Sequence, residues 1–163
     1  MKRLFTICMA VCLVSIFAFA GIGVSEEKNP YPIGIVLDLT GRYSSLGIPE
    51  KRGMEIAIDR INAAGGVNGR KLKPIVYDGE SNTSKAVLHT KRLINVDNAA
   101  TIAGFSSSGA SLASIPIAQA GKVPFFSAGS SQKIWIPTKK WAFNVVPRQR
   151  EASIPTLLKQ LQK

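Results

Sequence analysis

Residues 52–78 read RGMEIAIDRINAAGGVNGRKLKPIVYD. Apolar residues recur at helical spacing in the first half of this stretch, which predicts an amphipathic helix over 49–64. The glycine pair at 65–66 would end the helix, because glycine enters the left-handed cap conformation without steric cost. The Asn-Gly dipeptide at 68–69 predicts a tight turn, and the apolar run over 72–77 predicts a strand. The residues that define the apolar helix face are Met54, Ala57, Ile58 and Ile61.

The same alternation continues on both sides of this stretch. Upstream, IGIVLDL at 33–39 is apolar on both pleat faces, which is typical of a buried parallel strand. Downstream, we expect strands over 100–104, 123–127 and 142–146 and helices over 83–95, 109–121 and 152–162. Alternating strand and helix signals indicate βαβ units around a parallel sheet, so the predicted fold class is α/β.

The first 25 residues have the pattern of an export signal. A basic start precedes an apolar run of about 17 residues, shorter than the roughly 20 that span a bilayer, and a retained anchor is the alternative. Small side chains allow cleavage after Ala20 or after Ser25. Both cysteines, Cys8 and Cys12, would leave with this segment, which excludes disulfides and thiolate chemistry from the mature chain. We therefore expect residues 1–25 to be a signal peptide and the protein to be periplasmic or otherwise extracytoplasmic.

The chain is basic, with 21 Lys and Arg against 10 Asp and Glu and a formal net charge of +11. Such an excess could indicate a nucleic-acid or anionic surface partner. The basic residues are scattered along predicted helices and turns, however, and aromatic residues do not interleave with them as a base-stacking surface requires. We interpret them as a solvated exterior and expect no nucleic-acid partner.

Three polar loops follow the predicted strands, at 38–47, 105–109 and 127–131. In open α/β sheets this rim is where ligands bind. The second loop opens a helix, so its unpaired N–H groups, hydroxyls and helix dipole favour a carboxylate. The third offers carbonyl and hydroxyl oxygens to an ammonium group. Together they fit a small zwitterion, although serine-glycine clusters are often simple helix caps and a phosphate could use the same donors.

Catalytic groups are scarce in this sequence. The single histidine, His89, is expected on the surface of a helix, facing away from the strand ends. Asp38 follows a buried strand but has no evident histidine or second carboxylate partner. A hydrolase working through Asp38 or Ser108 is the enzymatic alternative. The sequence favours a binding protein that is not an enzyme and that uses no metal or cofactor.

Four segments carry a more specific signal: LTGRYSSLG at 39–47, the stretch quoted above, GFSSSGASLASIPIAQAGKVPFFSAGSS at 104–131 and FNVVPR at 143–148. Together they resemble the periplasmic branched-chain amino-acid binding proteins, the substrate-binding proteins of ABC transporters with the type I periplasmic-binding fold. The resemblance implies a two-lobed receptor that binds an amino acid or similar zwitterion between its lobes and delivers it to a membrane permease. A ligand-sensing domain of a regulator with the same fold is the alternative.

The resemblance also implies which residues hold the charged ends of the ligand. In the family a serine and backbone N–H groups bind the ligand carboxylate, and these positions fall on Ser108 and Gly109. Ser107 belongs to the same turn and is included with them. A backbone carbonyl and a hydroxyl bind the ammonium, and these fall on Gly129 and Ser131.

By the same resemblance, Leu46 stands where some members place an aromatic side chain over the ligand, and Tyr43 lies nearby. Residues 30–147 would form an incomplete N-terminal lobe, and 148–163 the hinge exit and the first helix of a second lobe. The strands that complete the first lobe would be missing, so an apolar sheet edge should be exposed. The ligand stays open among amino acids, amides and small carboxylates.

Overall fold

An all-parallel sheet forms the centre of the molecule and confirms the predicted α/β class. The computed structural model describes residues 29–146 and 154–161. The strands are β1 (Tyr31–Leu37), β2 (Leu72–Asp78), β3 (Thr101–Gly104), β4 (Phe125–Ser127) and β5 (Ala142–Asn144). They lie in the order β2-β1-β3-β4-β5, and every neighbouring pair is parallel. The carboxyl ends of all five strands therefore lie at one edge of the sheet.

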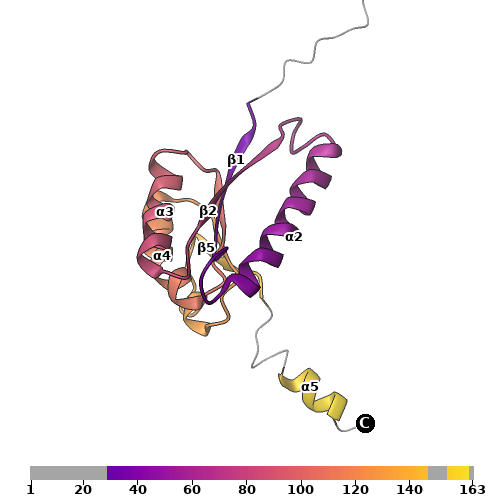
Figure 1. The fold of residues 1–163 in the computed structure, drawn as a ribbon, viewed down its shortest axis with the longest axis vertical. Helices are drawn as coiled ribbons and strands as arrows, with labels where there is room; N and C mark the ends of the chain where they lie inside the picture. The colour runs from indigo at the N-terminus through magenta and orange to yellow at the C-terminus, as the bar shows by residue number, and fades with distance from the viewer. Residues whose placement is uncertain (1–28, 147–153, 162–163) are drawn as a thin grey trace, which may run out of the picture.

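Helices cover both faces of this sheet (Figure 1). The covering helices are α2 (Ser44–Ala63), α3 (Thr83–Asn95) and α4 (Ser108–Gly121), and a 3₁₀ turn η1 (Gln132–Ile134) follows β4. A further helix, α5 (Ile154–Leu161), does not cover the sheet in Figure 1. In Figure 1, α2 lies on one side of the sheet, whereas α3 and α4 lie on the other. The helices predicted over 83–95 and 109–121 are confirmed as α3 and α4.

Two hydrophobic cores follow from the alternation of side chains along the strands. On the α2 face, Ile35 and Leu37 of β1 pack with Ile58 of α2. On the opposite face, a larger core joins the sheet to α3 and α4 through residues that include Val36, Leu93, Ile102, Ile115 and Phe125. Since β1 is buried on both faces, its nearly continuous apolar sequence is explained.

The glycine pair ends α2 as predicted. The N–H of Gly65 donates to the carbonyl of Asn62 at 3.2 Å, and that of Gly66 donates to the carbonyl of Ile61 at 2.8 Å. These are the two bonds of a Schellman cap, and Gly65 has the required positive φ of 96°. The turn at 68–69 also has positive φ at both residues, 52° and 74°, which matches its Asn-Gly sequence.

The start of α2 differs from the prediction. The sequence suggested a helix from Pro49 after a long loop over 38–47, but the helix begins at Ser44. The prediction was wrong because a proline in the second turn removes only one backbone hydrogen bond, and α2 continues through Pro49. Gly47 permits the early start, since a Cβ added there would lie 2.1 Å from the carbonyl oxygen of Asp38.

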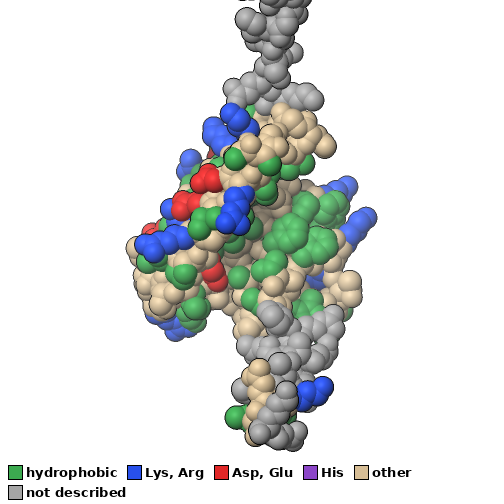
Figure 2. Space-filling view, turned by 90° about the vertical axis from the view of Figure 1, so that its right-hand side faces the viewer, with side chains coloured by type: hydrophobic (Ala, Val, Ile, Leu, Met, Phe, Trp, Pro, Cys, Tyr) green, Lys and Arg blue, Asp and Glu red, His purple; other side chains and the backbone are tan. Residues whose placement is uncertain are grey.

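The part of the α2 face formed by β4 and β5 is left open. Phe126 of β4 and Phe143 of β5 are register partners whose rings stack with centroids 5.2 Å apart. Their side chains stay 37% and 46% exposed, and Val145 beyond them is also exposed. Figure 2 shows a broad patch of hydrophobic side chains on this side of the molecule. Apolar residues are therefore exposed on one face of the sheet at this end, and the expected incompleteness of the lobe stays a prediction.

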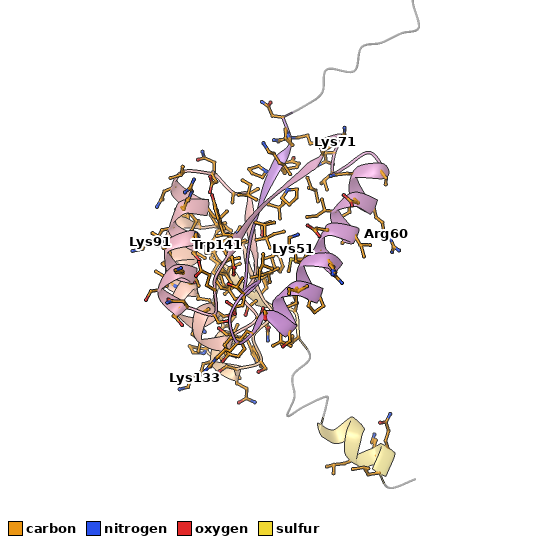
Figure 3. The ribbon with its side chains drawn as sticks, viewed as in Figure 1. Lys51, Arg60, Lys71, Lys91, Lys133 and Trp141 are labelled. Carbon is orange, nitrogen blue, oxygen red and sulfur yellow. The ribbon has the colours of Figure 1, made fainter. Side chains whose placement is uncertain are left out.

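The basic residues are distributed around the exterior. Figure 3 shows Arg60, Lys71, Lys91 and Lys133 extending from different sides of the molecule. Such a distribution agrees with a solvated surface rather than one basic face.

Parts of the predicted organisation lie outside the described residues. This applies to the signal peptide (1–25) and to half of the predicted hinge segment (148–163), of which the structure describes the helix over 154–161, so the signal peptide and the hinge stay predictions. Within 29–146 and 154–161, none of the helices combines the length and apolar character needed to span a membrane.

The contact between α2 and the end of β1 gives a first prediction. Gly47→Ala should lower the free energy of unfolding by roughly 1–3 kcal/mol, because its Cβ would overlap the Asp38 backbone. Gly53→Ala is the matched control, since it lies in the same helix with no atom within 4 Å of an added Cβ. It should raise the free energy of unfolding by about 0.5–1 kcal/mol. Urea denaturation followed by circular dichroism measures both, and equal effects would contradict the close approach.

Candidate ligand-binding site

The N-terminus of α4 presents unpaired backbone donors. Ser107 is the N-cap, and its hydroxyl oxygen accepts from the N–H of Ala110 at 3.2 Å. Within the described part of the chain, the N–H groups of Ser108 and Gly109 donate to no protein acceptor. Because α4 is 14 residues long, its dipole adds partial positive charge at this end. The turn therefore offers two donors to an anion, at the position that the sequence predicted.

The turn after β4 lies directly against this helix end. The N–H of Ser131 donates to the hydroxyl oxygen of Ser108 at 3.1 Å, although the two residues are 23 positions apart. A Cβ added to Gly129 would lie 3.0 Å from the Cα of Ser108. The structure confirms that the two serine turns lie side by side. Since the Ser108 oxygen accepts from Ser131, its hydroxyl hydrogen is free to donate to another group.

The second turn supplies acceptors. Gly129 donates its N–H to the hydroxyl of Ser127 at 3.0 Å, and its carbonyl accepts from no group of the described residues. The hydroxyl of Ser131 accepts from the N–H of Lys133 at 3.4 Å, at the start of η1. A carbonyl and a weakly engaged hydroxyl therefore stand close to the donors of α4.

A buried pair of hydroxyl groups joins the two turns from below. Ser127 of β4 donates to Ser111 of α4 at 2.7 Å, and both side chains are fully buried. Ser111 in turn donates to the carbonyl of Ser107 at 3.1 Å. Sequence reasoning missed Ser111, which falls on the core-facing side of α4. A serine four residues after an N-cap serine was the available signal, but only the fold shows its partner.

The backbone enters the first serine turn through a sparsely populated conformation. Phe105 has a φ of +62°, and Gly104 before it has a φ of +127°. A bulky residue at positive φ is strained, so its surroundings must hold it. Phe105 is buried, stacks on Phe125 at 5.0 Å and donates its N–H to the carbonyl of Val36 at 2.8 Å. These contacts direct the following serines toward the rim.

Asp78 organises the loop after β1. Its carboxylate accepts from the N–H groups of Leu39 (2.9 Å), Thr40 (3.3 Å) and Glu80 (2.8 Å) and from the Thr40 hydroxyl (2.8 Å). Burial by itself raises the pKa of Asp78, but these hydrogen bonds outweigh it and leave the pKa below its ordinary value. Asp78 is therefore a charged structural anchor.

The pKa of Asp38 is shifted in the opposite direction from that of Asp78. Its Oδ1 accepts from the N–H of Ser81 at 2.9 Å, whereas its buried Oδ2 has no partner in the described part of the molecule. Burial raises the pKa of Asp38, the Ser81 bond lowers it, and the nearby charge of Asp78 raises it again. The net direction is upward, which fits a carboxyl whose ionised form is poorly compensated.

Tyr43 and Leu46 lie near the start of α2. The guanidinium of Arg42 lies over the Tyr43 ring at 4.4 Å and also donates to its hydroxyl. Leu46 is 49% exposed. Among the described residues no hydrogen bond joins Tyr43 or Leu46 to the serine turns. Glu50, one helical turn after Leu46, does connect α2 to the serine turns, because its carboxylate accepts from the Ser106 hydroxyl at 2.6 Å. Sequence reasoning missed this residue.

His89 is not the surface residue that the sequence suggested. Its ring is half-buried and stacks on Tyr77 of β2, with centroids 4.7 Å apart and an angle of 4° between the planes. The prediction was wrong because the helix position faces an aromatic residue on the strand beneath it. No group of three or more His, Cys, Asp or Glu side chains in the described ranges is arranged to hold a metal ion.

A rim of this kind is a small-molecule binding site in open α/β sheets. A family model described as periplasmic binding protein matches residues 30–163. The chain therefore belongs to the periplasmic binding protein family.

Individual relatives share parts of the chain. "Leu/Ile/Val-binding protein homolog 7" of Brucella abortus is 37% identical over 108 residues, which cover 66% of this chain and 27% of that protein. "Leu/Ile/Val-binding protein homolog 8" of Brucella suis is 30% identical over 119 residues, covering 68% of this chain and 29% of the relative.

Solved structures show the same fold. LivJ, a branched-chain amino acid transporter substrate-binding protein from Streptococcus pneumoniae in complex with isoleucine, is 28% identical with a TM-score of 0.67, over 71% of this chain and 33% of that one. LivK, a leucine-binding protein from Thermotoga maritima, is 27% identical with a TM-score of 0.68, over 81% and 38%. The chain thus spans between 27% and 38% of the length of these four proteins.

The buried hydroxyl pair gives a second prediction. Ser111→Ala should lower the free energy of unfolding by about 1–3 kcal/mol, because it leaves the buried hydroxyl of Ser127 without its acceptor. The control is Ser114→Ala in the same helix, whose buried hydroxyl has no partner among the described residues. That change should be neutral or stabilising. Chemical denaturation of both variants checks this, and equal losses would contradict the role of the pair.

Asp78 gives a prediction of pH dependence. A carboxyl with a lowered pKa in the folded state stabilises the fold above its unfolded pKa of about 3.9, and this contribution is lost as the pH falls through the folded pKa. Asp78→Asn should therefore reduce stability at neutral pH, and the difference from the original protein should shrink below about pH 4. Denaturation at a series of pH values measures it, with exposed Asp59→Asn as the control. A difference that persists unchanged into acid would refute the charge-based explanation.

Proposed function

We propose that the chain is the N-terminal ligand-binding lobe of an extracytoplasmic receptor for an ABC uptake transporter, and that it binds an amino acid or similar small zwitterion. The observation that carries this proposal is the hydrogen bond between Ser131 and Ser108, which sets the unpaired donors of α4 beside the acceptors of the turn after β4. Membership of the periplasmic binding protein family supports the receptor role. The names of the relatives support amino acids as the ligand class.

The carboxylate of the ligand would lie at the N-terminus of α4. It would accept from the N–H groups of Ser108 and Gly109 and from the Ser108 hydroxyl hydrogen, with Ser107 holding the turn as its cap. Charge-assisted bonds of this type are stronger than neutral ones, and the helix dipole adds to them. The same donors discriminate against a ligand that has no anionic group.

The ammonium group would lie at the turn after β4. The carbonyl of Gly129 and the hydroxyl oxygen of Ser131 are the acceptors on offer. Because this turn adjoins the end of α4, one small molecule can contact both sets of groups. Leu46 and Tyr43 would contribute to the surroundings of the ligand side chain.

The proposal extends to location and partner. Residues 1–25 would direct export, and the receptor would deliver its solute to a membrane permease. In this reading a second lobe closes over the rim and supplies the rest of the site, as hinge closure does in two-lobed receptors.

The role of Ser108 gives the test of this function. A thermal-shift screen of the full-length gene product against L-amino acids should identify a ligand, and Ser108→Ala should weaken its binding by about 1–3 kcal/mol in calorimetric titration, because a hydrogen bond to a charged group is lost. Ser84→Ala is the matched control, an exposed serine at the start of α3. If no amino acid or small carboxylate binds, or if both variants bind like the original protein, the proposed function is wrong.

A further inference from the structure

One contact that fixes the first serine turn comes from the opposite side of the sheet. The hydroxyl of Ser106 donates to Oε2 of Glu50 at 2.6 Å. Glu50 belongs to α2, whereas Ser106 leads into α4, and these helices cover opposite faces of the sheet (Figure 1). The bond therefore ties the two helix layers together across the strand ends, two residues before Ser108.

Several features make this a strong contact. The acceptor is a carboxylate, the distance is short, and both side chains are half-buried. Burial raises the pKa of Glu50, the bond from Ser106 lowers it, and the charge of Asp38 raises it further. No ion pair of the described residues involves Glu50. Ser106 is accordingly its hydrogen-bond partner in this part of the structure.

The bond also restricts how the turn can move. Phe105 is held at positive φ by its burial and by its bond to Val36. A hydroxyl has a single hydrogen, and that of Ser106 is committed to Glu50. Without this bond, no side-chain contact among the described residues would hold Ser106 between the buried Phe105 and the cap at Ser107. Glu50 thus acts on Ser108 and Gly109 through Ser106.

We propose that Glu50 is a positioning residue, whose carboxylate holds the turn from Ser106 to Gly109 in the geometry that presents its donors to an anionic group of the ligand. The ligand part of this statement rests on the proposed function, whereas the positioning part concerns the unliganded protein. Preorganised donors bind more tightly because no ordering is required on binding.

Hydrogen exchange measured by NMR on the unliganded chain tests the positioning directly. The N–H of Ser131 bonds to Ser108 and that of Ala110 bonds to Ser107, so both amides report on the turn. Glu50→Ala should speed their exchange about tenfold, while the amide of Ala86 in α3 should change much less. Glu50→Gln, which keeps an acceptor oxygen for Ser106, should leave these two amides exchanging as slowly as in the original protein. Ser106→Ala should speed the same exchange as much as Glu50→Ala does. In the double variant the two amides should exchange no faster than in either single variant.

The matched control is Glu55→Ala, since Glu55 lies on the same helix and pairs with Lys51 at 2.6 Å. It should leave the exchange of Ser131 and Ala110 unchanged. Uniform acceleration of all amides in Glu50→Ala, including Ala86, would show a general loss of stability and overturn the proposal. Unchanged exchange in both Glu50→Ala and Ser106→Ala would overturn it as well.

Binding to the full-length gene product separates this proposal from the proposed function. Titration with L-leucine, L-isoleucine and L-valine should show about tenfold weaker binding for Glu50→Ala and near-original binding for Glu50→Gln. If none of the three binds the original protein, branched-chain amino acids are excluded as its ligands, while the exchange result still decides whether Glu50 positions the turn. If they bind and Glu50→Ala binds equally well, the positioning proposal fails and the function stands.

Discussion

Beneath the two serine turns, Ser127 donates a hydrogen bond to Ser111 in a part of the molecule that water does not reach. A buried hydroxyl without a partner is costly, so the Ser127 hydroxyl requires the acceptor that Ser111 provides. Their bond fixes the end of β4 against α4, and this brings Gly129 close to the backbone of Ser108. The contact between Ser131 and Ser108 at the rim depends on that placement. The geometry of the site at the rim therefore depends on a hydrogen bond in the core.

The carboxyl groups at the same rim differ in how well the protein satisfies them. Asp78 accepts several hydrogen bonds and has a lowered pKa, so it stabilises the loop after β1 as a charged group. Asp38 and Glu50 are less well compensated, and both have raised pKa values with burial as the largest cause. Glu50 nevertheless holds Ser106, which leads into the donors of α4. Asp78 and Glu50 thus hold the loops at the rim, and the N–H groups of Ser108 and Gly109 have no acceptor among the described residues.

The two faces of the sheet are covered to different extents. Helices α3 and α4 complete one face and enclose the larger core. On the other face α2 packs over β1 and β2, and the stacked rings of Phe126 and Phe143 stay exposed. Paired aromatic rings on an open sheet face are characteristic of surfaces that contact another element.

The sequence by itself determined the strands, most helix limits and the two serine turns, because these depend on local periodicity and on glycine and serine chemistry. Gly65 and Gly66 end α2 because glycine adopts the left-handed cap conformation without steric cost. Ser107 caps α4 because its hydroxyl accepts from a free N–H of the first turn. The early start of α2 at Ser44 was not predictable, since it depends on the contact of Gly47 with Asp38. Likewise, only the tertiary structure decided the pairs Ser111 with Ser127, Glu50 with Ser106 and His89 with Tyr77. The partners in each pair are brought together by sheet order and helix packing, which no local pattern encodes.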